Sequence, residues 1–271
     1  MVMTLRALIR CAPSKCLQIG TFWRPSCTRV RLAGHFARGS VQKRTHCARY
    51  FTSTDLPQHI APFFTFWPSY FSGDEQRLLL SAALQRLDSM DSVKMRRRRA
   101  KHQSPLDETG DIQGIFAPDN MYDFHEGHFD NVIHYYREMH LTSWPTELFP
   151  PLSAVLERLY SLCPGTDTQT HLLHLSSHGE ILPHIDNVSA SGTWILGVSL
   201  GDERTLRVSG VDDKRQEFEL SLPSGSVYLQ KDQLRYTFEH SISSRASVHP
   251  TGNQRLSIMV RDRPQQQPVP P

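Results

Sequence analysis

The fold is decided by residues 171–200, HLLHLSSHGEILPHIDNVSASGTWILGVSL. Short runs rich in Val, Ile and Leu alternate here with clusters of Ser, Gly, Asn and Asp, which is typical of strands separated by turns. The same alternation of apolar runs and turn residues continues toward the C-terminus, with a strand about every 8–12 residues. This spacing favours a β-sandwich or barrel over alternating strand and helix units. We predict strands at 171–176, 181–187, 193–200, 204–210, 216–220, 225–230, 235–241 and 255–262.

Two amphipathic helices are expected before the strands. Ser72-Gly-Asp-Glu75 is a capping-box sequence, in which the Ser and Glu side chains satisfy backbone N–H groups at a helix start. Apolar residues follow at helical spacing up to about residue 88, at positions 80, 83, 84 and 87. A second helix is predicted over 152–162, where Cys163-Pro-Gly165 ends it. The fold class is therefore mainly β with flanking helices (α+β).

The strand region holds residues suited to bind a metal. His184 and Asp186 are two positions apart, and residues two apart on a strand project to the same side. His240 would reach the same point from a neighbouring strand. Two imidazoles and one carboxylate on one face of the metal are what a non-haem Fe(II) oxygenase needs. Arg255, further along the chain, would supply a fixed charge that can anchor a carboxylate in a bidentate pair.

A second His-x-Asp sequence, His128-Phe-Asp130, competes with this assignment. It lies in a region of mixed pattern before the strands begin. Its possible distal partners, His174 and His178, have no arginine following at a comparable distance. His184, by contrast, is flanked by apolar residues and precedes the apolar strand at 193–200. A single histidine is usually an ordinary surface or hydrogen-bonded residue, but the ordered set that begins at His184 favours a metal site.

The chain resembles a known family from this point on. Arg255-Leu-Ser-Ile-Met-Val-Arg261 is similar to the Arg-x5-Arg pattern on the last core strand of the AlkB-like branch of the 2-oxoglutarate and Fe(II)-dependent dioxygenases. Residues 222–229 resemble the turn and strand that precede the distal histidine in this branch. The resemblance covers residues 60–263 and is strongest over 170–263. Residues 129–138 most resemble the mitochondrial member of the branch.

The resemblance implies a double-stranded β-helix, or jelly roll, and a role for each site residue. The Fe(II) ligands and catalytic residues would be His184, Asp186 and His240. Arg255 would pair with the distal carboxylate of 2-oxoglutarate, and Tyr228 would hydrogen-bond this cosubstrate. Arg261 would lie at the mouth of the site near the cosubstrate. From the residues alone, Tyr228 could equally be a half-buried strand tyrosine, and Arg261 could equally be a structural salt-bridge partner.

Charge is distributed unevenly along the chain. The 30 Lys+Arg and 27 Asp+Glu give a formal net charge of +3, but residues 1–54 contain ten of the basic residues and no acid. The remainder, with 20 basic and 27 acidic residues, has a formal charge of −7. An Arg-rich, acid-free N-terminus is typical of a mitochondrial transit peptide, and Arg49-Tyr-Phe-Thr-Ser53 resembles a matrix-protease site. A disordered basic arm that binds nucleic acid or anionic lipid is the alternative.

These features predict three segments and a location in the mitochondrial matrix. We expect a transit peptide at 1–51, a dioxygenase domain at 52–263 and a disordered Pro/Gln tail at 264–271. Only Cys163 of the five cysteines lies after residue 54, which excludes a disulfide scaffold and a Cys-cluster zinc site for the domain. No apolar run approaches the roughly 20 residues that span a bilayer. We expect a monomer.

The net charge of the domain is the main feature that bears on the class of substrate. AlkB-like enzymes that demethylate extruded bases need a basic surface for phosphate contacts, and the acidic domain offers only Arg96–Arg99. We interpret that run, within 94–111, as a solvated loop, with an anion or nucleic-acid contact as the alternative. We therefore expect a protein or small-molecule substrate, hydroxylated at the expense of O₂ and 2-oxoglutarate. The resemblance further implies links to fatty-acid metabolism and programmed necrosis. A nucleic-acid base demethylase and a non-enzymatic mitochondrial jelly-roll interaction protein are the alternatives.

Overall fold

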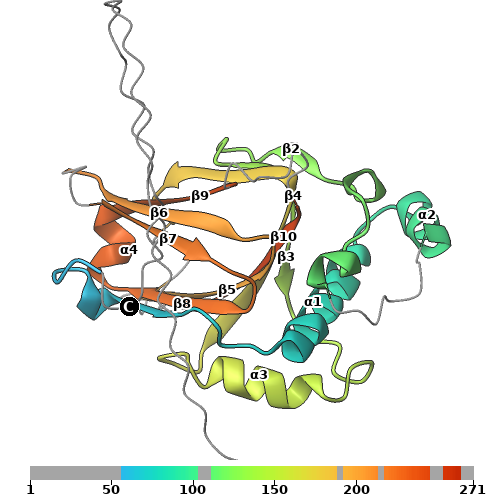
Figure 1. The fold of residues 1–271 in the computed structure, drawn as a ribbon, viewed down its shortest axis with the longest axis horizontal. Helices are drawn as coiled ribbons and strands as arrows, with labels where there is room; N and C mark the ends of the chain where they lie inside the picture. Colours follow the sequence, from blue (N-terminus) through green and yellow to red (C-terminus); the bar gives the residue numbers. More distant parts are fainter. Residues whose placement is uncertain (1–55, 103–110, 188–191, 213–216, 245–252, 264–271) are drawn as a thin grey trace, which may run out of the picture. The chain divides into compact units, whose positions relative to one another are not determined.

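A computed structural model describes residues 56–102, 111–187, 192–212, 217–244 and 253–263. Ten antiparallel strands in these ranges form one curled sheet, drawn in Figure 1. They are β1 (Phe64–Trp67), β2 (His125–Gly127), β3 (Ile133–Leu141), β4 (Thr168–His184), β5 (Trp194–Gly201), β6 (Arg204–Gly210), β7 (Glu217–Leu222), β8 (Ser226–Lys231), β9 (Phe238–Ser244) and β10 (Arg255–Asp262). The transit peptide predicted at 1–51 and the tail predicted at 264–271 lie outside the described residues.

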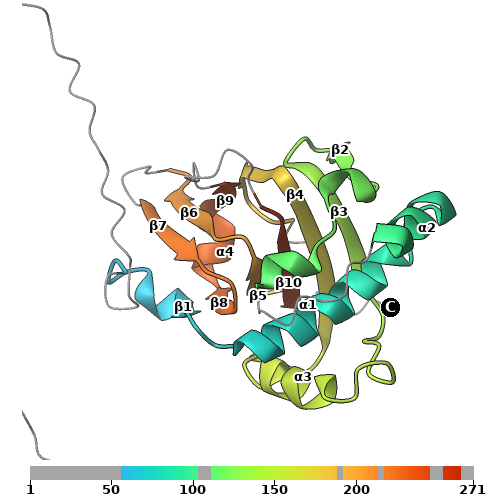
Figure 2. The same cartoon turned by 45° about the vertical axis from the view of Figure 1, so that its right-hand side comes forward.

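The sheet is curled into two facing layers by the long strand β4. The strand order is β1-β8-β5-β10-β4-β9-β6-β7, with β3 also paired to β4 and β2 to β3. The first half of β4 pairs with β10, whereas its end pairs with β9 at Ile181 and His184. β4 therefore belongs to both layers, and Figure 2 shows β6, β7 and β9 facing the layer that contains β5 and β8. This arrangement confirms the predicted mainly β jelly roll.

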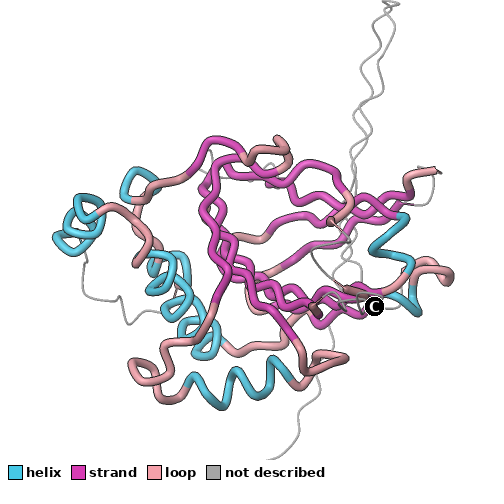
Figure 3. The backbone as a smooth tube through the Cα atoms, turned by 180° about the vertical axis from the view of Figure 1, so that it is seen from behind, coloured by secondary structure: helices cyan, strands magenta, loops and turns pink. Residues whose placement is uncertain are grey.

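The outer face of the larger layer is covered by two helices, α1 (Gly73–Asp88) and α3 (Leu152–Tyr160), which lie on one side of the strands in Figure 3. Ser72 caps α1 as predicted: its side chain accepts from the Glu75 N–H, and the Glu75 carboxylate accepts from the Ser72 N–H. The apolar faces of both helices pack on Leu196, Val198 and Leu200 of β5 and on alternate residues of β10. Burial of this apolar surface is the main force that holds the helices on the sheet.

The two sides of β10 have opposite character. Leu256, Ile258 and Val260 pack into the helix-covered core, so the residues between them face the inside of the jelly roll. Arg255 and Arg261 are six positions apart, an even number, and therefore both lie on the inner side. The inner core itself draws apolar residues from both layers: Phe64, Phe66, Leu173, Leu175, Leu206, Val208, Phe218, Leu220 and Ile242.

Three sequence predictions need correction, and strands β1, β2 and β3 were not predicted. Residues 171–187 form one strand up to residue 184 rather than two, because β4 continues past the turn-like residues 176–179. Residues 235–241 begin with a short helix, α4 (Gln233–Thr237), because Asp232 with φ 52° turns the chain out of β8. The basic run is not a loop but a helix, α2 (Val93–His102). β3 was missed because Tyr135, with φ 50° at a register shift, interrupts its alternation.

The described residues also form three short 3₁₀ helices, η2 (Ala61–Phe63), η3 (Ile112–Ile115) and η4 (Asp119–Met121). Within the described ranges, no helix is both long and apolar enough to cross a membrane.

Candidate metal centre

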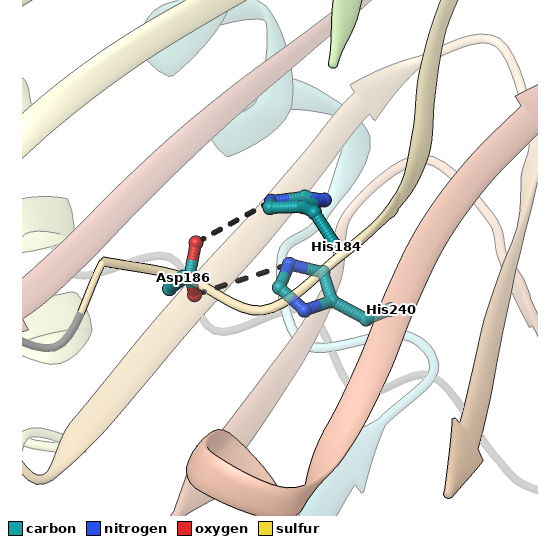
Figure 4. Close-up of side chains that lie close together, drawn as sticks. All are labelled: His184, Asp186 and His240. Carbon is teal, nitrogen blue, oxygen red and sulfur yellow. Dashed lines mark ion pairs between the residues drawn. The ribbon is translucent and has the colours of Figure 1, made fainter. Parts of the chain in front are cut away.

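The three predicted ligands meet where β4 and β9 end side by side. His184 is the last residue of β4 and lies in register with His240 of β9, and their ring centroids are 4.3 Å apart. Asp186 follows two residues after the strand and turns back toward both rings, as Figure 4 shows. Strand pairing thus brings together residues that are far apart in the sequence, and the chain beyond β4 adds the carboxylate.

The donor atoms are close enough to share one ion. Asp186 Oδ1 lies 3.5 Å from His184 Nε2, and Asp186 Oδ2 lies 3.9 Å from His240 Nε2. One ligand atom from each residue lies within 4.8 Å of the others, and no other group of three His, Cys, Asp or Glu side chains does so among the residues that the structure describes. Two imidazoles and a carboxylate form the donor set of a non-haem Fe(II) centre, so these residues fit that metal.

The backbone fixes which nitrogen of His184 faces the site. Its Nδ1 lies 2.9 Å from the carbonyl oxygen of Leu182, so Nδ1–H donates to that carbonyl in the neutral ring. The lone pair is then on Nε2, the atom nearest Asp186. Outer hydrogen bonds of this kind set the tautomer and orientation of metal-binding histidines.

The three side chains have different protonation behaviour. Burial opposes ionisation of Asp186, but His240, His184 and Arg235 outweigh it and lower the pKa of the carboxyl. Burial is also the largest influence on His240 and lowers its pKa to about 4. For His184, the Asp186 carboxylate and the Leu182 carbonyl overcome burial and raise the pKa above 6.5. Near neutral pH, Asp186 is therefore ionised and His240 is neutral, and His184 is the ligand that keeps its proton to the highest pH.

Metal binding will weaken as the pH falls through the raised pKa of His184. That imidazole must lose its proton before Nε2 can bind a metal, whereas Asp186 and His240 are already in their metal-binding forms. One proton is then displaced per ion, so the dissociation constant rises about tenfold for each pH unit below the pKa of His184. Titration with Mn(II) at a series of pH values measures this slope; a flat profile or a two-proton slope above pH 5 contradicts the assignment.

Arg255 lies fully buried on the inner side of β10. Its Nε–H donates to Ser199 Oγ at 3.0 Å, but no described residue accepts a hydrogen bond from its buried Nη1. Burial lowers the pKa of Arg255 to about 10, so the guanidinium stays charged at neutral pH. A buried cation with an unused donor is costly unless an anion joins it. The carboxylate of 2-oxoglutarate fits this position.

Tyr228 faces the same interior from β8. It is buried and stacks on Phe64, with ring centroids 6.1 Å apart. Its pKa is raised, mainly by burial and also by the Asp186 charge, while Arg255 acts to lower it. Its ring occupies the space above Gly197, where a Cβ would come within 2.6 Å of the hydroxyl oxygen. Glycine at that position is therefore what leaves room for the tyrosine ring.

Gly197→Ala will displace the Tyr228 ring and raise the concentration of 2-oxoglutarate needed for half-maximal binding. Overpacking of this kind typically costs about 1–3 kcal/mol of stability. The matched control is Gly114→Ala, because a Cβ there meets nothing within 4 Å. Calorimetric titration of 2-oxoglutarate into the Mn(II)-loaded proteins compares the two; an equal effect, or none, at Gly197 would remove Tyr228 from the cosubstrate site.

Two further arginines lie beside the ligands. Arg261, on the inner side of β10, has a buried Nε for which no described residue provides an acceptor. Burial lowers its pKa, and the Asp186 charge acts on it in the opposite direction. The sequence reasoning missed Arg235 of α4, which is fully buried, donates to the Gly192 carbonyl and places Nη2 3.8 Å from Asp186 Oδ2. No spacing or pattern marks Arg235 in the sequence, because its partners are distant along the chain.

The competing sequence His128-Phe-Asp130 does not form a second metal centre within the described residues. His128 Nδ1 lies 2.8 Å from Asp130 Oδ1 at the turn between β2 and β3, a local contact between neighbours. Burial opposes ionisation of Asp130, but hydrogen bonds from His128 and from the Val132 N–H lower the pKa of its carboxyl, and the charge of His184 adds to their effect. The Val132 carbonyl also accepts from the Leu182 N–H, two residues before His184. The turn therefore lies near the metal centre, as part of its surroundings.

The fold and this site define a class of protein, and comparison with known families gives the same class. A model of the 2OG-Fe(II) oxygenase superfamily matches residues 63–261, well over half of the chain. The chain belongs to the 2OG-Fe(II) oxygenase superfamily, whose cofactor is Fe(II) and whose cosubstrate is 2-oxoglutarate.

Two mitochondrial proteins resemble the chain in particular. The alpha-ketoglutarate-dependent dioxygenase alkB homolog 7, mitochondrial, of Mus musculus is 30% identical over 148 residues, covering 51% of this chain and 65% of the relative. The Bos taurus protein of the same name is 31% identical over 119 residues, covering 42% and 52%. The match spans less than two thirds of each relative. The predicted resemblance to the AlkB-like branch and to its mitochondrial member is confirmed.

Solved structures give a weaker likeness. The structure of OsALKBH1 aligns with 73% of this chain and 97% of its own at a TM-score of 0.41 and 15% identity. A Pseudomonas putida prolyl-4-hydroxylase aligns with 74% and 92% at a TM-score of 0.41 and 13% identity. The strand order of the chain itself defines the fold.

Proposed function

We propose that this protein is a mitochondrial Fe(II)- and 2-oxoglutarate-dependent dioxygenase that hydroxylates a protein or small-molecule substrate. The observation that carries the proposal is the His184, Asp186 and His240 cluster inside the same jelly roll as the buried, incompletely paired Arg255. A structural scaffold has no need for a convergent metal donor set, nor for a buried guanidinium with an unused donor. Both features are explained together if a metal and a dicarboxylate bind there.

Each side chain has a defined task in this proposal. His184 and His240, each through an imidazole nitrogen, and the Asp186 carboxylate would hold Fe(II). The distal carboxylate of 2-oxoglutarate pairs with Arg255, and the Tyr228 hydroxyl donates to the cosubstrate. When bound, Fe(II) and 2-oxoglutarate supply the oxidising chemistry: O₂ and 2-oxoglutarate are consumed, a substrate C–H becomes C–OH, and succinate and CO₂ leave. The apolar inner core excludes water around these groups.

The charges favour a protein or metabolite over nucleic acid as substrate. Residues 55–271 carry a formal charge of −7. Of the Arg96–Arg99 run, Arg99 is buried and ion-paired, so it is not available to phosphates. The transit-peptide composition of residues 1–51 and the mitochondrial names of two relatives support a location in the matrix. Involvement in fatty-acid metabolism and programmed necrosis belongs to the same proposal.

The proposal is tested with purified protein, Fe(II) and 2-oxoglutarate, by following succinate formation with and without a mitochondrial lysate. We expect slow succinate formation alone, and faster formation with the lysate, together with products that gain one oxygen atom. Demethylated bases without oxidised proteins or metabolites would favour the nucleic-acid demethylase. Absence of both succinate and bound iron would favour a non-enzymatic interaction protein.

The proposed location has its own test. Residues 1–54 fused to a fluorescent reporter should direct it to mitochondria, and a reporter that stays in the cytosol would contradict the transit peptide.

A further inference from the structure

The orientation of α2 is fixed by one buried arginine. Arg99 forms ion pairs with Asp91 at 2.6 Å and with Asp88 at 3.3 Å, and its Nη1 donates to the Met121 carbonyl at 2.5 Å. The helix face that bears Arg99 is therefore held against α1 and η4. The opposite face is turned outward, and both views in Figures 1 and 2 show α2 at the edge of the fold, outside the two sheet layers.

That outward face is a stripe of positive charge. Lys94, Arg97, Arg98 and Lys101 are spaced i, i+3, i+4 and i+7, so they share one face of the helix, opposite Arg99. All four are exposed, and α2 contains no acidic residue. The stripe extends about 10 Å along the axis at 1.5 Å per residue. Four cations without acidic partners in their own helix, on a domain that is otherwise acidic, form a surface for a polyanion.

An apolar edge runs beside the stripe. Met90, just before the helix, is 59% exposed, and Val93, its first residue, is 51% exposed. Ala100, two turns after Val93, is also exposed on that side. Phosphate backbones offer no partner for these apolar groups. A bilayer surface offers anionic headgroups to the stripe and the acyl boundary to the edge, and this is the combination that interfacial helices use.

We propose that this α2 surface, defined as Met90, Val93, Lys94, Arg97, Arg98 and Lys101, docks the protein on anionic phospholipid bilayers. Docking uses no residue of the metal centre, so the proposal stands or falls independently of the proposed enzymatic function. Docking would hold the domain at a membrane surface. The interior of the jelly roll would take no part in the contact with the membrane.

The test is cosedimentation of the full chain with vesicles of equimolar phosphatidylcholine and phosphatidylglycerol, compared with pure phosphatidylcholine. Arg97→Gln/Arg98→Gln should weaken binding to the anionic vesicles about 30-fold, which corresponds to about 1 kcal/mol per basic residue. The matched control, Arg77→Gln/Arg207→Gln, removes the same charge from side chains that are 41% and 51% exposed elsewhere and should change binding much less. Residues 1–54 are identical in all variants, so their charge contributes equally.

A second variant separates a bilayer from a soluble polyanion. Met90→Ser/Val93→Ser should weaken vesicle binding but leave heparin binding unchanged, since only the bilayer contacts the apolar edge. Vesicles should also slow amide hydrogen exchange within residues 93–102. Binding of vesicles through residues 1–54 alone would not produce this local change. Each result would support docking through this surface.

Three outcomes would overturn the proposal. The two arginine pairs could have equal effects on vesicle binding, so that only net charge matters. The serine variant could bind vesicles as the unmodified chain does, so that no apolar insertion occurs. The Arg97→Gln/Arg98→Gln variant could lose tRNA binding and keep vesicle binding, which would make the surface a nucleic-acid contact. A Tm that is unchanged in every variant verifies that the domain remains folded.

Discussion

Replacing His184, Asp186 or His240 by alanine will abolish 2-oxoglutarate-dependent succinate formation. Each substitution removes one of three donors that lie within 4.8 Å of one another. Loss of an outer hydrogen-bond partner of a metal ligand typically costs about 10- to 100-fold in affinity, so loss of a ligand itself should cost more. Succinate measured by chromatography, alongside Mn(II) affinity, reports both effects in the same samples.

The control for this prediction is His178→Ala. His178 lies on the same strand, β4, but its side chain is 79% exposed and outside the cluster. Its replacement should leave succinate formation and Mn(II) affinity unchanged. Undiminished succinate formation in the three ligand variants would contradict the assignment of the metal centre. An equal loss in His178→Ala would indicate general damage to β4.

Arg255→Met will raise the requirement for 2-oxoglutarate while leaving metal binding intact. Removing one partner of a buried, hydrogen-bonded charge pair costs about 2–5 kcal/mol, or roughly 30- to 4,000-fold at 1.4 kcal/mol per factor of ten. Since the guanidinium is buried with an unused donor in the free protein, its replacement by an apolar side chain relieves a desolvation cost. The Tm of the metal-free variant should therefore equal or exceed that of the parent protein.

Measuring both the 2-oxoglutarate requirement and the Tm distinguishes a role of Arg255 in binding the cosubstrate from a role in folding. Arg255→Lys retains a charge but not the two-pronged geometry and should fall between the parent protein and Arg255→Met. An unchanged 2-oxoglutarate requirement in Arg255→Met would exclude Arg255 as the anchor. A large fall in Tm would instead assign the residue a structural role through Ser199.

The sequence alone predicted the features that depend on residues close together in the chain. The capping box at Ser72 and Glu75 predicted the start of α1, because both hydrogen bonds join residues three apart. The run at 255–262 predicted strand β10 with the bounds that the structure has, because its apolar residues lie within a single short stretch. The ordered residue types predicted the three-ligand cluster, although only the register of β4 with β9 places His184 opposite His240.

The sequence alone did not predict the features that depend on contacts between residues far apart in the chain. Arg99 belongs to a charged run typical of a solvated segment, yet Asp88, Asp91 and the Met121 carbonyl hold it inside. Arg235 is buried beside Asp186 although the residues around it suggested a strand. A charged side chain is buried only when its partners compensate the loss of water, and sequence spacing does not reveal such partners.

The central claim, that the interior of this jelly roll is one site for a divalent metal and 2-oxoglutarate, has a direct test. Calorimetric titration of the purified protein with Mn(II), followed by 2-oxoglutarate, measures both stoichiometries without requiring a substrate. The account predicts one equivalent of metal, then one equivalent of 2-oxoglutarate that binds only when the metal is present. Tight binding of 2-oxoglutarate without metal, or no metal binding at neutral pH, would contradict it.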